Sequence, residues 1–430
     1  MRHPRSSAID ADAWPGVATV PSGRLVSVRA RLAEAAFARA CDAAGLDLDP
    51  SGDPDLVVEH EGLFARLAVA GWLGFAESYL AGEWRSDNLV DVLAALLSTG
   101  YRPRAGLPLG RKVGVYTGGE LPTELVRLSS GDGMSAFGGV FATGVPTTVR
   151  TAVPSHVPGG RGPDTHFIDL TTISEPTSAE RDDLGDAQAR AVTMLLDAAR
   201  VTAGTHLLEF PSTGGAVAIG ASARRATVDT LTADPEQAHV VGERLTLAGV
   251  DDSVSTQVID HPVPGPRDVR GRFDAIVSVD KFHVLAPGDR VALVRGFDRL
   301  LTVGGNIGLQ TVVATDAMTP SGRAAVEALR AYIWPDLDYP TATDIHRLVD
   351  RESGLRVVGQ THLGSHTALS LAMQHSLFDA HAREAAAAGF DVVFRRLWDY
   401  QFALRQALFR LGMLDAVQLT LTHRNRRGRR

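Results

Sequence analysis

Cysteine and long apolar runs are scarce in this sequence, and their scarcity excludes several kinds of protein. The single cysteine, Cys41, excludes an intrachain disulfide and any zinc site with several thiolate ligands, and it fits a reducing compartment. No run of about 18 apolar residues is present to cross a bilayer. Residues 1–15 have no apolar core of the kind that signal peptides carry. We therefore expect a cytoplasmic location, with peripheral contact with the inner face of the membrane as an alternative.

The charge balance excludes another class of function. With 43 basic and 50 acidic residues the formal net charge is −7, which disfavours a nucleic-acid-binding protein that acts through bulk positive charge. The tail, residues 424–430, is rich in arginine and offers a local contact for an anionic surface. The length of 430 residues predicts two or three domains, and 44% hydrophobic and 22% charged residues are typical of a globular chain.

The chain divides into segments of different pattern. Residues 1–125 are expected to form a mainly helical N-terminal domain, because apolar residues recur there at helical spacing. Residues 126–164 are crowded with Gly, Pro, Ser and Thr, which predicts a linker or a flexible loop. Residues 165–423 alternate strands and helices and form the expected second domain, and the Arg-rich tail 424–430 follows.

The alternation after residue 165 predicts the fold class of the second domain. Runs typical of buried strands are separated by amphipathic helices, and they lie at residues 205–210, 226–232, 254–259, 273–278 and 306–313. Strands joined through helices make right-handed crossovers and a parallel, doubly wound sheet. We therefore expect an α/β, Rossmann-like domain.

Polar residues at the ends of these strands indicate where a ligand would bind. In an open α/β sheet the ligand lies over the carboxyl ends of the strands, and the turn after the first strand reads Glu209-Phe-Pro-Ser-Thr-Gly-Gly215. Asp234 lies 19 positions after Gly215, which is close to the spacing of about 20 at which a carboxylate meets ribose hydroxyls. Asp260 closes the following strand, near an expected adenine. The residues predicted to bind an adenosine-type cofactor are Glu209, Gly214, Gly215, Asp234, Gln237 and Asp260.

The same turn also has a purely structural interpretation. Pro211 removes a backbone N–H donor, and Ser212 and Thr213 stand where glycines would allow close approach of a cofactor. Asp residues at strand ends commonly serve in turns or as helix caps. A plain strand-to-helix turn therefore stays open as the alternative to a cofactor loop.

Longer blocks of the sequence are recognisable as motifs. Residues 71–84 read Gly-Trp-Leu-Gly-Phe-Ala-Glu-Ser-Tyr-Leu-Ala-Gly-Glu-Trp, and residues 389–400 read Gly-Phe-Asp-Val-Val-Phe-Arg-Arg-Leu-Trp-Asp-Tyr. Shorter matches fall in order at residues 7–15, 273–278, 304–305, 332–335, 407–410 and 415–418. In these blocks the chain resembles the cyclopropane-fatty-acyl-phospholipid synthase family of S-adenosylmethionine-dependent methyltransferases. It is most similar to the actinobacterial branch that makes the methylene precursor of 10-methyl, tuberculostearic-type fatty acids.

The resemblance implies a fold, a cofactor and a reaction. The fold is a seven-stranded, mostly parallel, Rossmann-like methyltransferase sheet with a smaller helical N-terminal domain, and the cofactor is S-adenosylmethionine. The reaction is methyl transfer to the double bond of a phospholipid-bound acyl chain, with a bound bicarbonate ion as the base in the family. The implied partners are an active methyltransferase paralogue, a flavin-dependent reductase, and phospholipid acyl chains or the membrane surface, without nucleic acid.

This sequence departs from the family at the positions that hold the bicarbonate. Ile173-Ser174-Glu175 stands where the family has Tyr-Ser-Cys, and the run Lys281-Phe-His-Val-Leu285 places His283 at the family's Glu position. Gln310 and Thr367 stand where a His and a Tyr are usual, and the family's substrate-covering segment is replaced by a glycine-rich region. Two hypotheses follow. The favoured one is a catalytically degenerate, non-catalytic partner subunit, and the other is an active lipid C-methyltransferase in which Glu175 and His283 supply the base.

Overall fold

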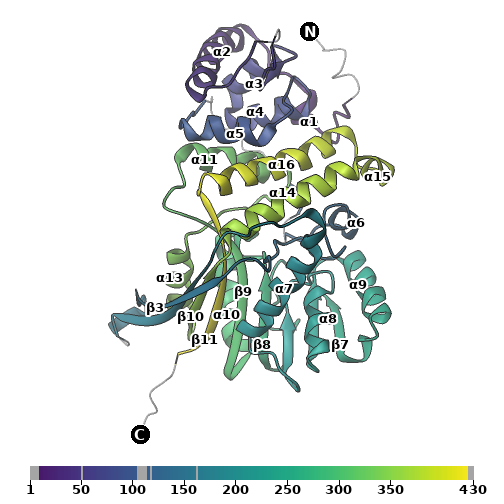
Figure 1. The fold of residues 1–430 in the computed structure, drawn as a ribbon, viewed down its shortest axis with the longest axis vertical. Helices are drawn as coiled ribbons and strands as arrows, with labels where there is room; N and C mark the ends of the chain where they lie inside the picture. Colours follow the sequence, from purple (N-terminus) through teal and green to yellow (C-terminus); the bar gives the residue numbers. More distant parts are fainter. Residues whose placement is uncertain (1–8, 50–51, 104–113, 117–118, 161–162, 425–430) are drawn as a thin grey trace. The chain divides into compact units, whose positions relative to one another are not determined.

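The computed structural model describes residues 9–49, 52–103, 114–116, 119–160 and 163–424, which form two compact units (Figure 1). The first, here called the helical unit, consists of Met1–Val115, Asp316–Pro335 and Phe378–Met413. The second, the sheet unit, consists of Tyr116–Thr315, Asp336–Leu377 and Leu414–Arg430. The division differs from the expected boundaries at 125 and 165, because two stretches from the C-terminal half of the chain pack with the N-terminal helices.

The helical unit contains helices from both ends of the chain. Its elements are α1 (Pro15–Ala18), α2 (Arg24–Ala44), α3 (Gly62–Ala70), α4 (Trp72–Leu80), α5 (Leu89–Ser98), α11 (Pro320–Ala325), α12 (Glu327–Tyr332), α15 (Ala382–Ala387), α16 (Val392–Arg410) and the short pair β1 (Val57–Val58) and β2 (Trp84–Arg85). Helix α16 packs against α4 and α5. Helix α14 (Gly364–Ala380) crosses from the sheet unit into the helical unit. Among the described residues, none of the helices combines the length and the hydrophobicity that a bilayer crossing needs.

The motif at residues 71–84 forms the core of the helical unit. Phe75 and Trp84 stack with their ring centroids 4.4 Å apart, and Trp72 meets Phe75 edge-on at 5.6 Å. A Cβ at Gly74 would lie 2.1 Å from the Arg66 carbonyl oxygen, so only glycine lets α4 approach α3 this closely. This motif is therefore explained by packing.

A buried arginine joins the first helices of this unit. Arg66 is 1% exposed, and its Nε lies 3.1 Å from both carboxylate oxygens of Glu83. Its two Nη groups donate to the carbonyl oxygens of Gly16 and Val17 at 2.7 and 2.6 Å. Burial raises the pKa of Glu83, and the Arg66 charge opposes that shift. The arginine thus fixes the segment around α1 to α3 and to the turn before β2.

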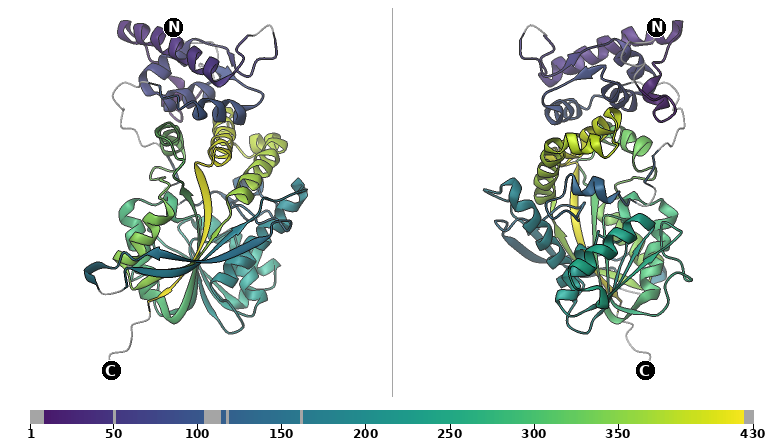
Figure 2. Two further views of the ribbon diagram at one scale, coloured as in Figure 1. Left: turned by 60° about the vertical axis from the view of Figure 1, so that its left-hand side comes forward. Right: turned by 90° about the vertical axis from the view of Figure 1, so that its right-hand side faces the viewer.

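The sheet unit is built on a nine-stranded sheet with the order β3-β4-β10-β11-β9-β8-β5-β6-β7 (Figures 1 and 2). The strands are β3 (Pro146–Pro154), β4 (Thr165–Ile173), β5 (His206–Glu209), β6 (Thr227–Thr232), β7 (Val254–Val258), β8 (Phe273–Val279), β9 (Leu301–Ala314), β10 (Leu355–His362) and β11 (Leu414–His423). Strands β7, β6, β5, β8 and β9 pair in parallel, and β11 is antiparallel to both β9 and β10. This confirms the mostly parallel, Rossmann-like α/β fold.

Two strands extend the expected seven at the edge of the sheet. Strand β4 pairs in parallel with β10, and β3 pairs with β4 in antiparallel register along its whole length. Strand β3 lies in the segment 126–164 that the sequence analysis assigns to a linker. Its residues are mostly exposed, so they show no alternation of apolar and polar side chains from which a strand could be recognised.

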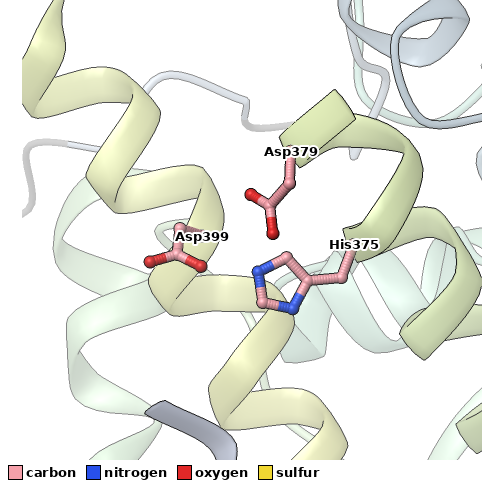
Figure 3. A group of neighbouring side chains, drawn as sticks. All are labelled: His375, Asp379 and Asp399. Atoms are coloured by element: carbon pink, nitrogen blue, oxygen red, sulfur yellow. The ribbon is translucent and has the colours of Figure 1, made fainter. Parts of the chain in front are cut away.

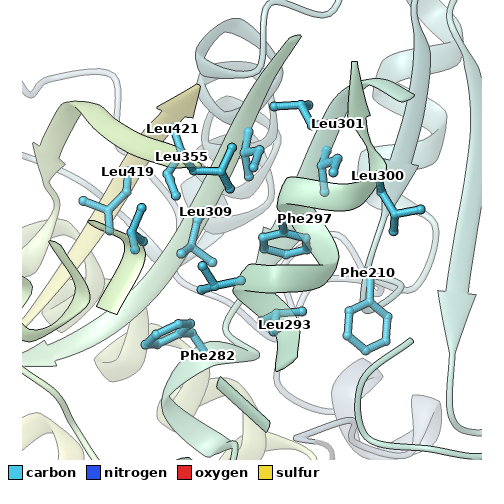
Figure 4. Close-up of a cluster of buried hydrophobic side chains, with 14 of the residues drawn as sticks. Phe210, Phe282, Leu293, Phe297, Leu300, Leu301, Leu309, Leu355, Leu419 and Leu421 are labelled. Atoms are coloured by element: carbon cyan, nitrogen blue, oxygen red, sulfur yellow. The ribbon is translucent and has the colours of Figure 1, made fainter. Parts of the chain in front are cut away.

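Helices cover both faces of the sheet (Figure 2). Helices α10 (Pro287–Leu300) and α13 (Ala342–Glu352) lie on one face, and α7 (Leu184–Ala198), α8 (Ala216–Ala223) and α9 (Pro235–Leu247) lie on the other. The main core lies under α10, where Leu293 and Phe297 pack against Leu309 and Leu355 (Figure 4). The pair Gly304-Gly305, one of the short sequence matches, lies inside β9, which begins directly after α10 at Leu301.

We predict that Arg66→Met destabilises the helical unit by about 3–5 kcal/mol, because it leaves the Glu83 carboxylate buried without its partner. Native-state hydrogen exchange of the α3 and α4 amides measures this unit separately from the sheet. The control is Arg85→Met, whose ion pair with Glu59 is 3.0 Å long and largely exposed, and we expect it to cost less than ~1 kcal/mol. Equal losses of protection in the two variants would contradict a structural role of the buried pair.

Candidate functional site

The turn between β5 and α8 uses its polar groups to hold itself together. Glu209 is buried, and its Oε1 accepts hydrogen bonds from the backbone N and the Oγ1 of Thr213 at 2.8 and 2.5 Å. Thr213 Oγ1 in turn accepts from the N–H of Val217 at 3.0 Å. Burial raises the pKa of Glu209, and hydrogen bonds from Thr213 and Thr230 oppose the shift. The acidic residue predicted to bind a cofactor therefore stabilises the first turn of α8.

A stretch of the glycine-rich region covers this turn. We call residues 130–137 the covering segment. A Cβ at Gly214 would lie 2.7 Å from the Met134 carbonyl oxygen, and Gly214 has a φ of +72°, so glycine is required there for both reasons. Arg244 joins the two stretches, since its Nη1 donates to the Gly214 oxygen at 3.0 Å and its Nη2 to the Gly133 oxygen at 2.7 Å.

Helix α7 binds the covering segment through hydrogen bonds of Gln188. Gln188 Oε1 accepts from the backbone N–H groups of Gly131 and Asp132 at 3.1 and 3.2 Å, and its Nε2 donates to the carbonyl oxygens of Ser135 and Phe137. This part of the expected linker is consequently an integral layer of the sheet unit. Gln188 and Arg244 hold it from outside, and Asp132 accepts hydrogen bonds from Met134 and Ser135 within it.

A buried ion pair lies beside the turn, at the ends of β6 and β8. Glu120 Oε2 accepts from Thr232 Oγ1 at 2.5 Å and from the Ala233 N–H at 2.9 Å, and its Oε1 lies 3.7 Å from Lys281 Nζ. Lys281 is fully buried, with Nζ 4.9 Å from the centroid of the Phe210 ring. Burial lowers the pKa of Lys281 to about 8, and the Glu120 carboxylate opposes the shift. Near neutral pH the lysine is therefore charged and paired.

A small cavity remains between the turn, the covering segment and the ion pair. Its volume is about 70 Å³, and it is lined by Gly119, Glu120, Leu121, Val126, Met134, Ala136, Phe137, Pro211, Ser212, Thr213, Gly214, Gln237, Val279 and Asp280. Pockets for small-molecule ligands usually measure roughly 300–1,000 Å³. The Oγ of Ser212 is buried at this cavity with no hydrogen-bond partner among the described residues. The cavity as it stands holds water-sized molecules.

The structure gathers some of the predicted cofactor residues and not others. Gly214 and Gln237 line the cavity, Glu209 and Gly215 lie in the turn beside it, and Gln237 Oε1 is 2.6 Å from Thr232 Oγ1. Asp234 is the N-cap of α9, where its Oδ1 accepts from the Glu236 N–H at 2.9 Å. Asp260 is exposed after β7 and is absent from the cavity lining.

Glu120, Thr232 and Lys281 are the polar residues of this site that the sequence analysis misses. Lys281 carries a signal, because it is one of two lysines in the chain and directly follows an apolar strand. Glu120 has no such sequence signal, since it lies in a stretch without periodicity.

The two candidate catalytic residues lie in different parts of the sheet. Glu175 is exposed after the end of β4. His283 is buried after β8, with Nδ1 3.0 Å from Thr311 Oγ1 and its ring stacked on Tyr339 at 5.6 Å. Strands β10, β11 and β9 lie between β4 and β8 in the sheet. The Gln310 side chain, at the family's His position, is buried and accepts from Gln418 Nε2 at 2.9 Å.

A second cluster of acidic groups lies in the helical unit (Figure 3). The hydroxyl of Tyr79 donates to Asp399 of α16, and burial together with the charges of Asp399 and Asp379 raises the pKa of Tyr79. His375 lies one turn before Asp379 on α14 but belongs to the sheet unit. Within the helical unit, these acidic side chains interact with a structural tyrosine.

The chain is similar to known proteins along most of its length. Residues 177–419 match the family described as mycolic acid cyclopropane synthetase. Tuberculostearic acid methyltransferase UfaA1 of Mycobacterium tuberculosis is 29% identical over 432 residues, which cover 97% of this chain and 96% of that protein.

Two solved structures share the fold of this chain. The cyclopropane synthase MmaA2 from Mycobacterium tuberculosis has a TM-score of 0.51 at 22% identity. The match covers 57% of this chain and 87% of the MmaA2 chain. Coclaurine N-methyltransferase bound to N-methylheliamine and SAH has a TM-score of 0.58 at 13% identity. The match covers 81% of this chain and 98% of the coclaurine N-methyltransferase chain.

We predict that the stability difference between the wild type and Lys281→Met depends on pH above 8. The unfolded chain keeps the lysine proton up to a pKa near 10.4, whereas the folded chain loses it at about 8. Between these values the unfolded state holds more protons, so the wild type gains stability relative to the variant, by about 3 kcal/mol over the whole range. Urea denaturation of the two proteins from pH 7 to 10.5 measures the difference.

The same titration in a Glu120→Gln background provides the control. Removing the carboxylate takes away the charge that favours the protonated amine, so the pH-dependent window should begin below pH 8. A difference between wild type and Lys281→Met that stays flat across this range would contradict the burial of a charged lysine.

Proposed function

Since this chain belongs to the mycolic acid cyclopropane synthetase family, we propose that it keeps the methyltransferase fold but acts as a non-catalytic partner subunit in fatty-acid methylation. The observation that carries the proposal is the ion pair of Glu120 with Lys281 at the carboxyl ends of the parallel strands. This edge of a doubly wound sheet is where a nucleotide-type ligand binds.

The ion pair competes with the family's cofactor for this edge of the sheet. S-adenosylmethionine carries a positive sulfonium group, and Lys281 adds a second, fully buried cation at the same edge of the sheet. A ligand that took the place of the Glu120 carboxylate at Thr232 and Ala233 would separate this carboxylate from Lys281. Breaking a buried pair in this way costs about 3–5 kcal/mol. If the cofactor displaces Glu120, this cost reduces its binding free energy.

The space around the turn opposes the cofactor as well. A cavity of about 70 Å³ does not fit a group that contains adenosine and methionine, so Glu120 and the covering segment would both have to move. Thr232, Gln237 and Ser212 are the polar groups that such a movement would free. In the present arrangement the residues do not fit the cofactor, and we derive no chemical step through it.

The candidate bases give no support for proton removal at this site. Glu175 is exposed after β4, and His283 is committed to Thr311 and packed on Tyr339. Loss of a general base alone reduces rates by roughly 10²–10⁴-fold. The partners that we propose for this subunit are an active methyltransferase relative and a flavin-dependent reductase.

An active lipid C-methyltransferase is the second candidate. The similarity to a tuberculostearic acid methyltransferase along 97% of the chain favours it. In that case Glu175 or His283 would supply the base in place of the bicarbonate that is usual in the family, and S-adenosylmethionine would bind after Glu120 is displaced.

We predict that the purified chain, given labelled S-adenosylmethionine and unsaturated phospholipid vesicles, transfers label no faster than background. Isothermal titration with S-adenosylmethionine should show weak binding or none. The double variant Glu120→Gln/Lys281→Met removes both charges while keeping similar side-chain volumes, so it should bind the cofactor more tightly than the wild type. An active relative should turn over faster when it is co-expressed with this chain than when it is expressed alone.

Robust transfer by the wild type would refute the non-catalytic proposal. If that transfer disappeared in Glu175→Gln or His283→Ala, the active methyltransferase with a substituted base would replace it. Tight wild-type binding that Asp234→Ala weakened by ~1.5–3 kcal/mol would place the ribose on Asp234, as the sequence spacing predicts. Unchanged affinity in that variant would agree with the capping role of Asp234 in α9.

A further inference from the structure

Helix α2 has a second apolar side that packs against nothing described in the helical unit. The helix buries Phe37, Ala40 and Cys41. Leu25, Val28 and Leu32, in contrast, are 79%, 61% and 67% exposed. Their spacing of three and four residues places them in one row, and at about 3.6 residues per turn this row faces nearly away from the buried side. We call Leu25, Val28 and Leu32 the exposed apolar row.

Arginines border the exposed apolar row on both sides. Arg24, Arg29 and Arg31 are exposed, and residues 24–33 contain no acidic residue. This local positive charge contrasts with the formal net charge of −7 for the whole chain. An exposed apolar row between arginines is the pattern of helices that lie in the plane of a membrane interface.

We propose that this side of α2 binds the surface of an anionic phospholipid bilayer. The three apolar side chains enter the boundary between headgroups and acyl chains, while the arginine stems extend along it and their guanidinium groups meet lipid phosphates. The buried side of α2 stays packed in the helical unit through Phe37 and Cys41, so the helix lies on the membrane and does not cross it. The proposal does not rest on the presence or absence of methyl transfer.

Charge and area favour a membrane over a protein partner or a second copy. Three aliphatic side chains offer a few hundred Å² at most, whereas specific protein interfaces bury ~1,200 Å² or more. Interfacial helices need no such area, because anionic lipids add about 1 kcal/mol for each basic residue near the surface. The basic α2 end of the chain is attracted to an anionic surface.

Vesicle flotation with the full chain tests the proposal. We expect binding to vesicles of phosphatidylglycerol and phosphatidylethanolamine, weak binding to pure phosphatidylcholine, and weaker binding at high salt. The variant Leu25→Ser/Val28→Ser/Leu32→Ser should bind at least tenfold more weakly. The control Leu247→Ser/Val303→Ser changes residues that are 88% and 91% exposed in the sheet unit, and it should bind as the wild type does.

The arginines are tested separately. Arg24→Gln/Arg29→Gln/Arg31→Gln should lose about 100-fold, or about fivefold per residue, which follows from about 1 kcal/mol each. The control Arg267→Gln/Arg270→Gln/Arg383→Gln removes three other exposed arginines and should bind normally. Wild-type chain that fails to bind anionic vesicles, or controls that lose as much affinity as the α2 variants, would overturn the proposal.

A fluorescent label locates the contact, because the only cysteine of the chain is buried and its pKa is raised by burial to about 12. Val28→Cys or Leu32→Cys carrying a polarity-sensitive dye should shift to the blue with anionic vesicles. Glu34→Cys, on the other exposed side of α2, should not shift. Equal shifts at positions 28 and 34 would refute an oriented contact.

A wild-type dimer that dissociates in the triple Ser variant, with no vesicle binding, would assign this side to a second copy instead.

Discussion

A lysine buried at the end of a central strand requires a carboxylate beside it, and this requirement determines how the residues at the carboxyl ends of the parallel strands are arranged. An unpaired ammonium at the position of Lys281 would cost several kcal/mol, so Glu120 is held inside the domain. Its carboxylate also accepts hydrogen bonds from Thr232 and Ala233 at the end of β6. The residues around Glu120 and the covering segment then close over the turn after β5. The ion pair and the covering segment together leave the small cavity.

The helical unit contains a buried cation with a different consequence. Arg66 has several donors in a planar group, and they are used by Glu83 and by two backbone carbonyl oxygens. It therefore joins three stretches of chain and is a structural centre. Lys281 is a compact charge that forms an ion pair with Glu120, and it lies where a ligand of this fold would bind. The two sites show why a buried basic residue has to be interpreted together with its partners.

Sequence reasoning predicts the parts of this structure that depend on local patterns. The strands β5, β6, β8 and β9 overlap the segments that the sequence predicts as strands, and Gly215 lies at the start of α8 as the turn motif suggests. It does not predict β3, because an exposed edge strand has no apolar alternation. Nor does it predict that α16 packs with the N-terminal helices, because that contact joins residues more than 300 positions apart.

The candidate site shows the same limit on a smaller scale. A carboxylate at Asp234 has the spacing of a ribose ligand and the hydrogen bond of a helix cap, and spacing alone does not distinguish the two. Glu120 comes from a stretch without a pattern and reaches the site only through the tertiary fold. Lys281 is visible in the sequence as a rare residue type after an apolar strand, but its partner is not. The sequence therefore indicates the buried charge of Lys281 but not the ion pair that it forms with Glu120.

The edge strand β3 also determines where the sheet stops growing. An unpaired edge exposes backbone donors and acceptors to strands of other molecules, which is a route to aggregation. Pro146 and Pro154 begin and end β3, and neither has an N–H group to donate. Between them Arg150 lies over the exposed ring of Phe167, 5.6 Å from its centroid, and adds charge to this edge. The nine-stranded sheet thus ends in a strand that is a poor template for a tenth.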